Sequence, residues 1–355
     1  KFLSLLFLTD FFPPKFSATG QYSYHQAKKY SKKNIKTSII GISDKKMTLT
    51  DENLRIIGIK SIKLIKKSKI KRILWNIDVC IKICNETLKI KKDFKYIVLN
   101  GTPQFLIYFV YFLNFYLNKK LIFRTTDFFP ETEMTINKNF FLKILLNILL
   151  SLTRYIKKKT YKIQFLGYDQ KKYLLSKIDI KKFQVKRDVC LVNFNKIKKT
   201  NNKNYKIIMY SGNLGLAHDY KTFVNGLNLF FNKFPQKKNR IKIWINSTGQ
   251  KLPDFLNELR KNEIRFFKTN PIRIEKLDKL LNKADLQMIF LKKEFLGIVM
   301  PSKIYCIIKS QTKILYIGPK ESDVFYLGKK YRNEDFVHVA NDDTVSLANF
   351  FEKFI

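Results

Sequence analysis

Cysteine, arginine and long apolar runs are scarce in this sequence of 355 residues, and each shortage excludes a class of protein. The cysteines are Cys80, Cys84, Cys190 and Cys306; only the first two lie close together, so no second pair completes a zinc site. The apolar runs 105–117 and 140–152 are shorter than the roughly 20 residues that span a bilayer, and we expect buried or amphipathic helices there. With no secretory signal recognised, we expect reduced thiols and a cytoplasmic protein.

The positive charge is large, with a net value of +41, but arginine supplies only 10 of the 69 basic residues. Arginine is the residue best suited to bidentate contacts with phosphates and base edges, so we expect no nucleic-acid partner. Lysine, asparagine, isoleucine and phenylalanine dominate instead, which is typical of an AT-rich coding bias spread over the surface. Lysines also attract anionic membranes, and the run 140–152 is followed by Arg154 and Lys157–Lys159. We therefore expect peripheral contact at the cytoplasmic face of a membrane.

Short apolar runs alternate with helix-length polar segments, which predicts an α/β protein built on parallel sheets. The lysine- and asparagine-rich stretch 196–204 cannot add to a core and reads as a linker. We expect two Rossmann-like, doubly wound domains facing a cleft, at 1–195 and 205–340, and a C-terminal helix at 341–355 that packs back towards the first domain. The expected strands are 2–9, 37–42, 96–99, 121–125 and 161–165, then 206–210, 241–245, 264–267, 286–291 and 313–317.

The phrase Asp-Phe-Phe-Pro occurs twice, at 10–13 and at 127–130, each time after an expected strand. A proline that follows an aromatic pair ends the strand sharply and leaves the aspartate at the carboxyl edge of the sheet. Open α/β sheets bind their ligands at that edge. Asp10 and Asp127 are therefore candidate site residues, with chance repetition in a phenylalanine-rich chain as the alternative for Asp10.

A glycine turn follows the expected strand 206–210, and Asp219 is placed to cap the next helix. Glycines let the backbone approach a ligand closely, and the start of a helix presents N–H groups to an anion. His218, beside the cap, either donates to a phosphate or is structural. The candidate phosphate-binding residues of the turn are Gly212, Asn213, Leu214 and Gly215.

A second candidate anion site begins at Pro301, Ser302 and Lys303, after the strand 286–291. Proline suits the first turn of a helix, and the N–H groups behind it would join the Lys303 ammonium in a compact anion site. Glu321, after the strand 313–317, would place a carboxylate near the same edge. Lys303 is otherwise one lysine among 59, and its expected position at a helix start sets it apart.

These motifs, in this order, resemble the donor domain of glycosyltransferase family four. The most similar branch builds cell-surface polysaccharides, and the resemblance covers nearly the whole chain. It implies a GT-B fold and a retaining, metal-independent enzyme of the hexosyl or N-acetylhexosaminyl transferase type. It rests on Ser211–Gly215 with His218 and Asp219, on Ser247–Gln250, on Ala284 with Asp285 and on Pro301–Lys303, and in the first half on the segments 7–14, 127–131 and 165–167 with Gly20.

The resemblance also implies substrates and roles. No cofactor is implied; a nucleotide-diphosphate sugar is the co-substrate, and the acceptor is a saccharide or a lipid-linked molecule in surface polysaccharide or O-antigen synthesis. The glycine turn would lie near the donor phosphates, residues 301–303 would hold the diphosphate and ribose, and the loop from Phe267 to Asn270 would border the base. Asp10, Thr19 and Gly20 would belong to the acceptor side, with Gly20 in a flexible loop.

Asp127 is the expected catalytic group, which would orient or deprotonate the acceptor hydroxyl or stabilise the cationic sugar. One feature departs from the family pattern. Many members have two glutamates eight positions apart, whereas here Glu294 is followed at that spacing by Ser302. Ribose recognition would then pass to Lys303, to Glu321 or to backbone groups.

Two other functions fit parts of the sequence. A nucleotide-sugar epimerase of the same architecture would need more acid–base side chains than His25, His218 and His338 offer. A basic nucleic-acid-binding protein would need a base-reading module or an arginine-rich patch, and the sequence shows neither.

Overall fold

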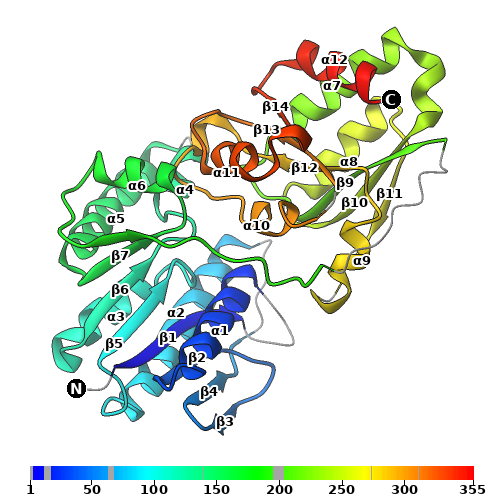
Figure 1. Ribbon diagram of the computed structural model, residues 1–355. Coiled ribbons are helices and arrows are strands. Elements are labelled where there is room, and N and C mark those ends of the chain that lie inside the picture. Colours follow the sequence, from blue (N-terminus) through cyan, green and yellow to red (C-terminus); the bar gives the residue numbers. More distant parts are fainter. Residues whose placement is uncertain are drawn as a thin grey trace. The chain divides into compact units, whose positions relative to one another are not determined.

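The computed structural model divides into two compact units (Figure 1). It describes residues 3–11, 17–62, 68–137, 139–194, 204–272, 274–310 and 312–355. The first unit runs to Leu166 and resumes at Gln170–Arg187, and the second comprises Gly167–Asp169 and Asp188–Ile355. Of the expected linker 196–204, only Asn204 lies among the described residues.

The first unit is built on an eight-stranded sheet in the order β3-β4-β2-β1-β5-β6-β7-β8. The chain winds outward from β1 in both directions, as in doubly wound folds, and every neighbouring pair is parallel except the β3–β4 hairpin. The strands are β1 (Ser4–Phe11), β2 (Lys36–Ile42), β3 (Met47–Asp51), β4 (Leu54–Ile59), β5 (Tyr96–Asn100), β6 (Lys120–Arg124), β7 (Lys162–Phe165) and β8 (Phe183–Val185). The helices are α1 (Ala18–Ser31), α2 (Lys69–Lys89), α3 (Leu106–Leu117), α4 (Glu131–Ile136), α5 (Phe140–Lys159) and α6 (Tyr168–Leu175).

The second unit has a six-stranded, fully parallel sheet in the order β11-β10-β9-β12-β13-β14. Its strands are β9 (Lys206–Asn213), β10 (Ile241–Thr248), β11 (Phe266–Thr269), β12 (Leu286–Phe290), β13 (Lys313–Ile317) and β14 (Phe336–Val339). Its α-helices are α7 (Tyr220–Lys233), α8 (Leu252–Lys261), α9 (Leu277–Leu281), α10 (Ile304–Ile307), α11 (Asp323–Arg332) and α12 (Thr344–Phe354). Short 3-10 turns η1 (Pro235–Arg240), η2 (Ile274–Lys276), η3 (Lys293–Phe295) and η4 (Asn333–Asp335) join them.

The predicted α/β architecture with two parallel, Rossmann-like sheets is confirmed. Each expected strand corresponds to an observed one, namely β1, β2, β5 to β7 and β9 to β13. The prediction missed β3, β4, β8 and β14. The reason is plain for two of them, because β3 is polar and mostly exposed and β8 has only three residues. Neither shows the apolar run that signals a buried strand.

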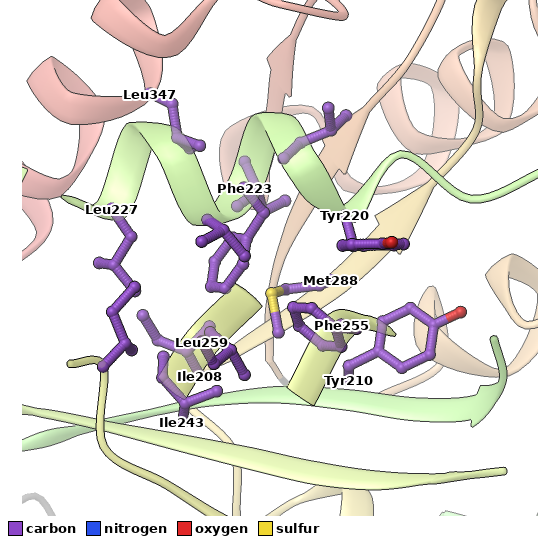
Figure 2. Packing of buried hydrophobic residues seen from close by; sticks show 14 of the residues in the cluster. Ile208, Tyr210, Tyr220, Phe223, Leu227, Ile243, Phe255, Leu259, Met288 and Leu347 are labelled. Atoms are coloured by element: carbon purple, nitrogen blue, oxygen red, sulfur yellow. The ribbon is translucent and has the colours of Figure 1, made fainter. Parts of the chain in front are cut away.

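The core of the second unit lies between α7 and the sheet (Figure 2). Phe223 and Leu227 point from α7 towards the strands that carry Ile208 and Ile243, and all four side chains are buried. Burying an apolar side chain of this size contributes about 1.5–3 kcal/mol, so α7 is fixed by its inner face. The apolar stripe of this helix is at most 6% exposed, and its members are Phe223, Leu227, Phe230 and Phe231.

Helix α12 lies beside α7 in the second unit (Figure 1). Leu347 is fully buried, and the Phe351 ring lies 6.2 Å from that of Phe223 and 5.9 Å from that of Phe230, measured between centroids. The sequence predicts that this helix packs back towards the first domain, whereas its buried side chains belong to the core of the second unit. An apolar stripe shows that a helix has an inner face, but it does not show which core receives that face.

The two apolar runs form α3 and α5, and α5 is amphipathic as expected. Leu146 and Ile156 are buried, whereas Phe141 and Ile148 are 80% and 61% exposed. Within the described ranges, no helix combines the length and the hydrophobicity that a bilayer crossing requires.

Candidate functional site

The glycine turn after β9 is held by the neighbouring strand β10. The two strands pair to their carboxyl ends, where Gly212 lies opposite Ser247. The Ser247 hydroxyl donates to the Gly212 carbonyl at 2.6 Å, and the Leu214 N–H donates to the Thr248 carbonyl at 2.7 Å. Gly212 has a φ of +114°, a conformation that side-chain-bearing residues rarely adopt, so the turn requires glycine there.

Lys303 brings its ammonium group to this turn. A Cβ atom placed on Gly212 would lie 3.8 Å from Cε and 4.0 Å from Nζ of Lys303. The same Nζ lies 3.3 Å from the centroid of the Tyr210 ring, a cation–π contact. Nζ is shielded from solvent and has no hydrogen-bond partner among the residues described. The glycine turn and Lys303, about 90 positions apart in the chain, thus meet in the second unit.

Burial perturbs both basic groups at the turn. It lowers the pKa of the Lys303 ammonium well below its usual value. It also lowers the pKa of His218, to about 3, and the nearby Lys303 charge adds to this effect. The Nδ1 atom of His218 accepts the Gly215 N–H at 3.0 Å. His218 is therefore a neutral imidazole that shapes the turn, which favours its structural interpretation.

Asp219 caps α7, and this prediction is confirmed. Its Oδ1 accepts the Thr222 N–H at 3.3 Å. Its Oδ2 accepts the Thr222 hydroxyl at 2.6 Å and the Asn341 amide at 2.7 Å. The carboxylate is satisfied by these internal donors, so Asp219 holds the helix start in place.

The four candidate residues of the turn differ in what they can offer a ligand. The Leu214 side chain is buried, its N–H is paired with β10, and its carbonyl accepts the Lys251 N–H at 3.0 Å. The Gly215 N–H is paired with His218. Asn213 is exposed at the end of β9. Ligand contact at this turn therefore falls to Gly212 and Asn213, while Leu214 and Gly215 give the turn its shape.

The expected helix starting at Pro301 is wrong in its start and length. The α-helix α10 covers only Ile304–Ile307, and residues 301–303 form the turn before it. The N–H groups of Ile304 and Tyr305 donate to the carbonyls of Pro301 and Ser302, at 3.2 Å each. A single helical turn sums few peptide dipoles, and these two N–H groups are already used. The positive charge at this place therefore comes from the Lys303 side chain rather than from a helix start.

The carboxyl ends of β10 and β11 form a polar edge. The Asn246 amide donates to the Thr269 hydroxyl and to the Asn270 carbonyl, both at 2.8 Å. Phe267 does not belong to this edge, because its ring lies on that of Trp244, with 5.0 Å between centroids, and is 40% exposed. The segment from Phe267 to Asn270, which was expected to border the base, is thus divided. Phe267 lies on a face of the sheet, whereas Thr269 and Asn270 lie at the carboxyl ends of the strands.

Glu321 lines a different hollow. It precedes α11, whose cap Ser322 accepts the Phe325 N–H at 3.1 Å. The hollow has a volume of about 580 Å³, and Lys320 is also part of its lining. Neither Lys303 nor Gly212 lines it, so the described residues show no shared pocket for Glu321 and Lys303.

In the first unit, Asp10 at the end of β1 is directed at the start of α1. Its carboxylate accepts the Ser17 hydroxyl, and Ser17 caps α1 by accepting the Gly20 N–H at 2.9 Å. Burial raises the pKa of Asp10, an effect opposed by the Ser17 hydrogen bond. A Cβ atom on Gly20 would lie 1.8 Å from the Phe11 carbonyl oxygen, so only glycine fits. The expectation of a flexible loop is wrong, because Thr19 and Gly20 lie in the first turn of α1.

Asp127 lies just beyond the carboxyl end of β6, and it is exposed. This is the position that the Asp-Phe-Phe-Pro phrase predicts. In the other copy of the phrase, Phe12 and Pro13 lie outside the described residues. Asp127 belongs to the first unit, whereas the glycine turn and Lys303 belong to the second.

Sequence reasoning missed a buried ion pair next to Asp127. Glu131 and Lys157 are 3% and 1% exposed, with 4.0 Å between Oε1 and Nζ. The Lys157 ammonium also lies 4.4 Å from the centroid of the Phe128 ring. Lys157 is therefore not one of the cations that the sequence assigns to a membrane-facing run. Helical spacing carried the signal, because Thr153, also buried, lies four positions earlier on the same face.

The geometry at Gly212 and Lys303 suits an anion that arrives from solvent. An ammonium group buried without a counterion is unfavourable, and a bound phosphate would supply both the missing charge and charge-assisted hydrogen bonds. The exposed amide of Asn213 can donate beside it. Among the residues described, no three His, Cys, Asp or Glu side chains are grouped to hold a metal ion.

Comparisons with known proteins show the fold. No protein-family model and no curated protein matches the sequence. Sucrose-phosphate synthase from Thermosynechococcus elongatus superposes with a TM-score of 0.68 at 10% identity, over 99% of this chain and 89% of that one. A structure described as trehalose-6-phosphate from E. coli bound with UDP-2-fluoro glucose gives 0.67 at 10% identity, over 99% and 90%. A glycosyltransferase from Rickettsia africae ESF-5 gives 0.61 at 14% identity, over 99% and 88%. The chain therefore has the GT-B fold, with two Rossmann-like domains.

Proposed function

We propose that the protein is a glycosyltransferase that binds a nucleotide-diphosphate sugar at the Gly212 turn and Lys303. The observation that carries the proposal is the Lys303 ammonium, whose Nζ would lie 4.0 Å from a Cβ atom placed on Gly212 and which lacks a hydrogen-bond partner among the described residues. The structural neighbours support it, since one is a glycosyltransferase and another is described with a UDP-sugar analogue. The donor would carry a hexosyl or N-acetylhexosaminyl group, and the acceptor would be a saccharide or a lipid-linked molecule in surface polysaccharide or O-antigen synthesis.

The chemistry explains why a lysine is needed at this place. Breaking the bond between the anomeric carbon and the diphosphate builds negative charge on the leaving group. A cation fixed beside that group binds it more tightly in the transition state than in the ground state, which accelerates the step without a metal ion. In this proposal the reaction retains the anomeric configuration, and Asp127 orients or deprotonates the acceptor hydroxyl. Asp10 keeps a positioning role, because Ser17 already occupies its carboxylate.

A transfer assay tests the function. A panel of nucleotide sugars is first screened by thermal shift, since only a bound ligand stabilises the fold. Release of nucleoside diphosphate is then measured with and without saccharide and lipid-linked acceptors, and we expect release only with an acceptor. An epimerase would convert the sugar without releasing diphosphate. A nucleic-acid-binding protein would ignore nucleotide sugars and lose its ligand steeply as salt rises, and either result contradicts the proposal.

Proton uptake on donor binding is a prediction specific to Lys303. Burial lowers its pKa in the free protein, and an adjacent phosphate would raise it again. Between the two pKa values the complex holds more protons than the free protein, so affinity should fall as pH rises through that window. Titration calorimetry at about pH 8 in buffers of different ionisation enthalpy should show uptake of up to about one proton per nucleoside diphosphate. The same uptake in Lys303→Met would show that another group takes the proton.

The peripheral membrane contact in this proposal rests on an apolar face in the first unit. Helix α5 exposes Phe141 and Ile148, and the neighbouring helix α3 exposes Phe115, which is 74% accessible. The rings of Tyr111 and Tyr155 join the two helices, 6.3 Å apart between centroids. We propose an anionic lipid surface as the occupant, because exposed lysines border the face: Lys143, Lys158 and Lys159.

Vesicle binding checks this membrane contact. The double variant Phe141→Ser/Ile148→Ser should bind vesicles containing phosphatidylglycerol at least about tenfold more weakly in co-sedimentation, because two apolar side chains no longer enter the lipid. Nucleoside diphosphate binding should be unchanged, and neutral phosphatidylcholine vesicles should bind the wild type weakly. If the face instead joins two copies of the chain, sedimentation velocity will show a dimer that the variant disrupts, with no change in vesicle binding.

A further inference from the structure

The hollow that Glu321 lines lies beside the start of helix α11, in the second unit, and is called the α11 hollow below. Its walls come from the segment 320–330 and from Tyr168 and Asp169, which also belong to the second unit. Its volume of about 580 Å³ is within the roughly 300–1,000 Å³ that is usual for small-molecule sites. The donor site at Lys303 does not use this space, because Lys303 is not part of its lining.

Hydrogen bonds fix the two walls of the α11 hollow to each other. The Asp169 carboxylate accepts the Asp323 N–H at 3.0 Å, and the Asp323 carboxylate accepts the Tyr168 N–H at 3.1 Å. The Ser322 hydroxyl accepts the Phe325 N–H at 3.1 Å. These N–H groups at the start of α11 are therefore already paired, and a ligand in the hollow must be recognised by side chains.

Two tyrosine rings form a corner of the α11 hollow. The rings of Tyr168 and Tyr326 lie 6.1 Å apart between centroids, with an interplanar angle of 87°. Because these residues are 51% and 43% exposed, ring surface is accessible to a ligand. A sugar ring has a face of C–H groups, and the electron-rich face of an aromatic ring attracts such groups. Two perpendicular rings can therefore contact one sugar from two sides.

The charged groups of the lining balance each other and favour a neutral, hydroxyl-rich ligand. The ammonium groups are those of Lys320, Lys329 and Lys330, and the carboxylates are those of Asp169, Glu321 and Asp323. The Lys330 ammonium also donates to the Tyr326 hydroxyl at 3.4 Å, which places a cation beside the ring. An anionic ligand would meet the carboxylates, and an apolar ligand would remove water from both kinds of charge. Hydroxyl groups donate to carboxylates and accept from ammonium groups, so a polyol satisfies both.

We propose that the α11 hollow binds a neutral saccharide of hexose or N-acetylhexosamine units. A sugar ring lies against Tyr168 and Tyr326, and its hydroxyl groups donate to Glu321 and accept from Lys320. The strand β13 leads to the hollow and β12 leads to Lys303, and these parallel strands are neighbours that share one carboxyl edge. The bound saccharide is therefore the part of the acceptor chain beyond the reacting sugar. This acceptor role rests on the proposed function, whereas saccharide binding does not.

Fluorine NMR on the full chain labelled with 3-fluorotyrosine tests the binding. Tyr168→Phe and Tyr326→Phe assign the two resonances. A panel of neutral trisaccharides of glucose, galactose, mannose and N-acetylglucosamine is then titrated without nucleotide, and at least one should shift both resonances to saturation. Inorganic phosphate at the same concentrations should shift neither. If no trisaccharide moves both resonances, or if phosphate moves them and the trisaccharides do not, the hollow is not a saccharide site.

A matched pair of variants tests whether the Tyr326 ring makes the contact. Tyr326→Ala should weaken trisaccharide binding at least about tenfold, read from the Tyr168 resonance, because one of the two rings is lost. Tyr331 lies on the same helix, is also exposed and is not part of the lining, so Tyr331→Ala should bind normally. Urea unfolding checks that both variants fold. Wild-type affinity in Tyr326→Ala, or equal loss in both variants, would overturn the stacking contact.

The acceptor role is a separate measurement. In the transfer assay, Tyr326→Ala should raise the KM for a trisaccharide acceptor at least about tenfold more than the KM for the corresponding monosaccharide. The affinity for nucleoside diphosphate should not change. An equal effect on both acceptors, in a variant that has lost trisaccharide binding, would overturn the acceptor role. If the wild type transfers no sugar, the proposed function fails instead, and the fluorine titration still decides whether the hollow binds saccharide.

Discussion

Lys303→Met is expected to yield a protein that is more stable than the wild type and binds its donor poorly. A buried ammonium without a hydrogen-bond partner destabilises the fold, and the Tyr210 ring offsets only part of that cost. Replacing it with an apolar side chain of similar length should raise the free energy of unfolding by about 1–2 kcal/mol. The same change removes the counterion of the diphosphate, a loss of about 3 kcal/mol, so the dissociation constant should rise about a hundredfold.

Tryptophan placement makes the stability measurement specific to the second unit. The chain has two tryptophans, Trp75 in the first unit and Trp244 in the second. In a Trp75→Phe background, urea unfolding followed by fluorescence reports on the second unit alone, which matters because two units need not unfold together. Calorimetric titration with nucleoside diphosphate gives the affinity in the same samples.

Two control variants test whether the Lys303 side chain itself binds the donor. Lys313→Met removes the same charge at the exposed amino end of β13 and should change neither stability nor affinity. Asp127→Asn lies in the first unit and should leave donor affinity unchanged while lowering turnover. If Lys303→Met is less stable than the wild type and binds the nucleotide normally, Lys303 is a structural residue and the donor site lies elsewhere.

The meeting of Lys303 with the glycine turn could be predicted from the sequence because it follows from topology. In a parallel sheet the carboxyl ends of adjacent strands share one edge, and β9 and β12 are neighbours. The segments that follow these strands carry the turn and Lys303. Apolar runs and one glycine turn therefore predict the position of this candidate site.

The burial and the bonding partners of individual side chains could not be predicted in the same way. A lysine-rich chain gives no sign that Lys303 is withdrawn from solvent, because burial depends on the packing of distant segments. The short α10 was also hidden, since its one turn is set by bonds to the carbonyls of residues 301–303 rather than by a long apolar stripe. Asp10 looked like a ligand group, and its partner Ser17 became evident only from side-chain geometry.

Lys157→Met is expected to destabilise the first unit by about 3–5 kcal/mol, because it leaves the Glu131 carboxylate buried beside an apolar group. Neither oxygen of Glu131 has a hydrogen-bond partner in the described part of the chain, so its charge is compensated by the Lys157 ammonium at 4.0 Å. The measurement is urea unfolding in a Trp244→Phe background, where Trp75 reports on the first unit. The midpoint should fall while the slope stays constant.

The double variant Glu131→Gln/Lys157→Met decides whether charge or packing accounts for the contribution of Lys157 to the stability of the first unit. If the cost of the single change is an uncompensated charge, removing the carboxylate as well should restore most of the stability, with a coupling energy of about 2–3 kcal/mol between the two sites. If the lysine stem only fills space beside Phe128, methionine fills nearly the same space, and both variants should resemble the wild type. Loss of stability that persists in the double variant would contradict a stabilising role for the ion pair.

The pair fixes α4 to α5 directly after Asp127, so full recovery of stability with reduced turnover would show that it also positions this loop.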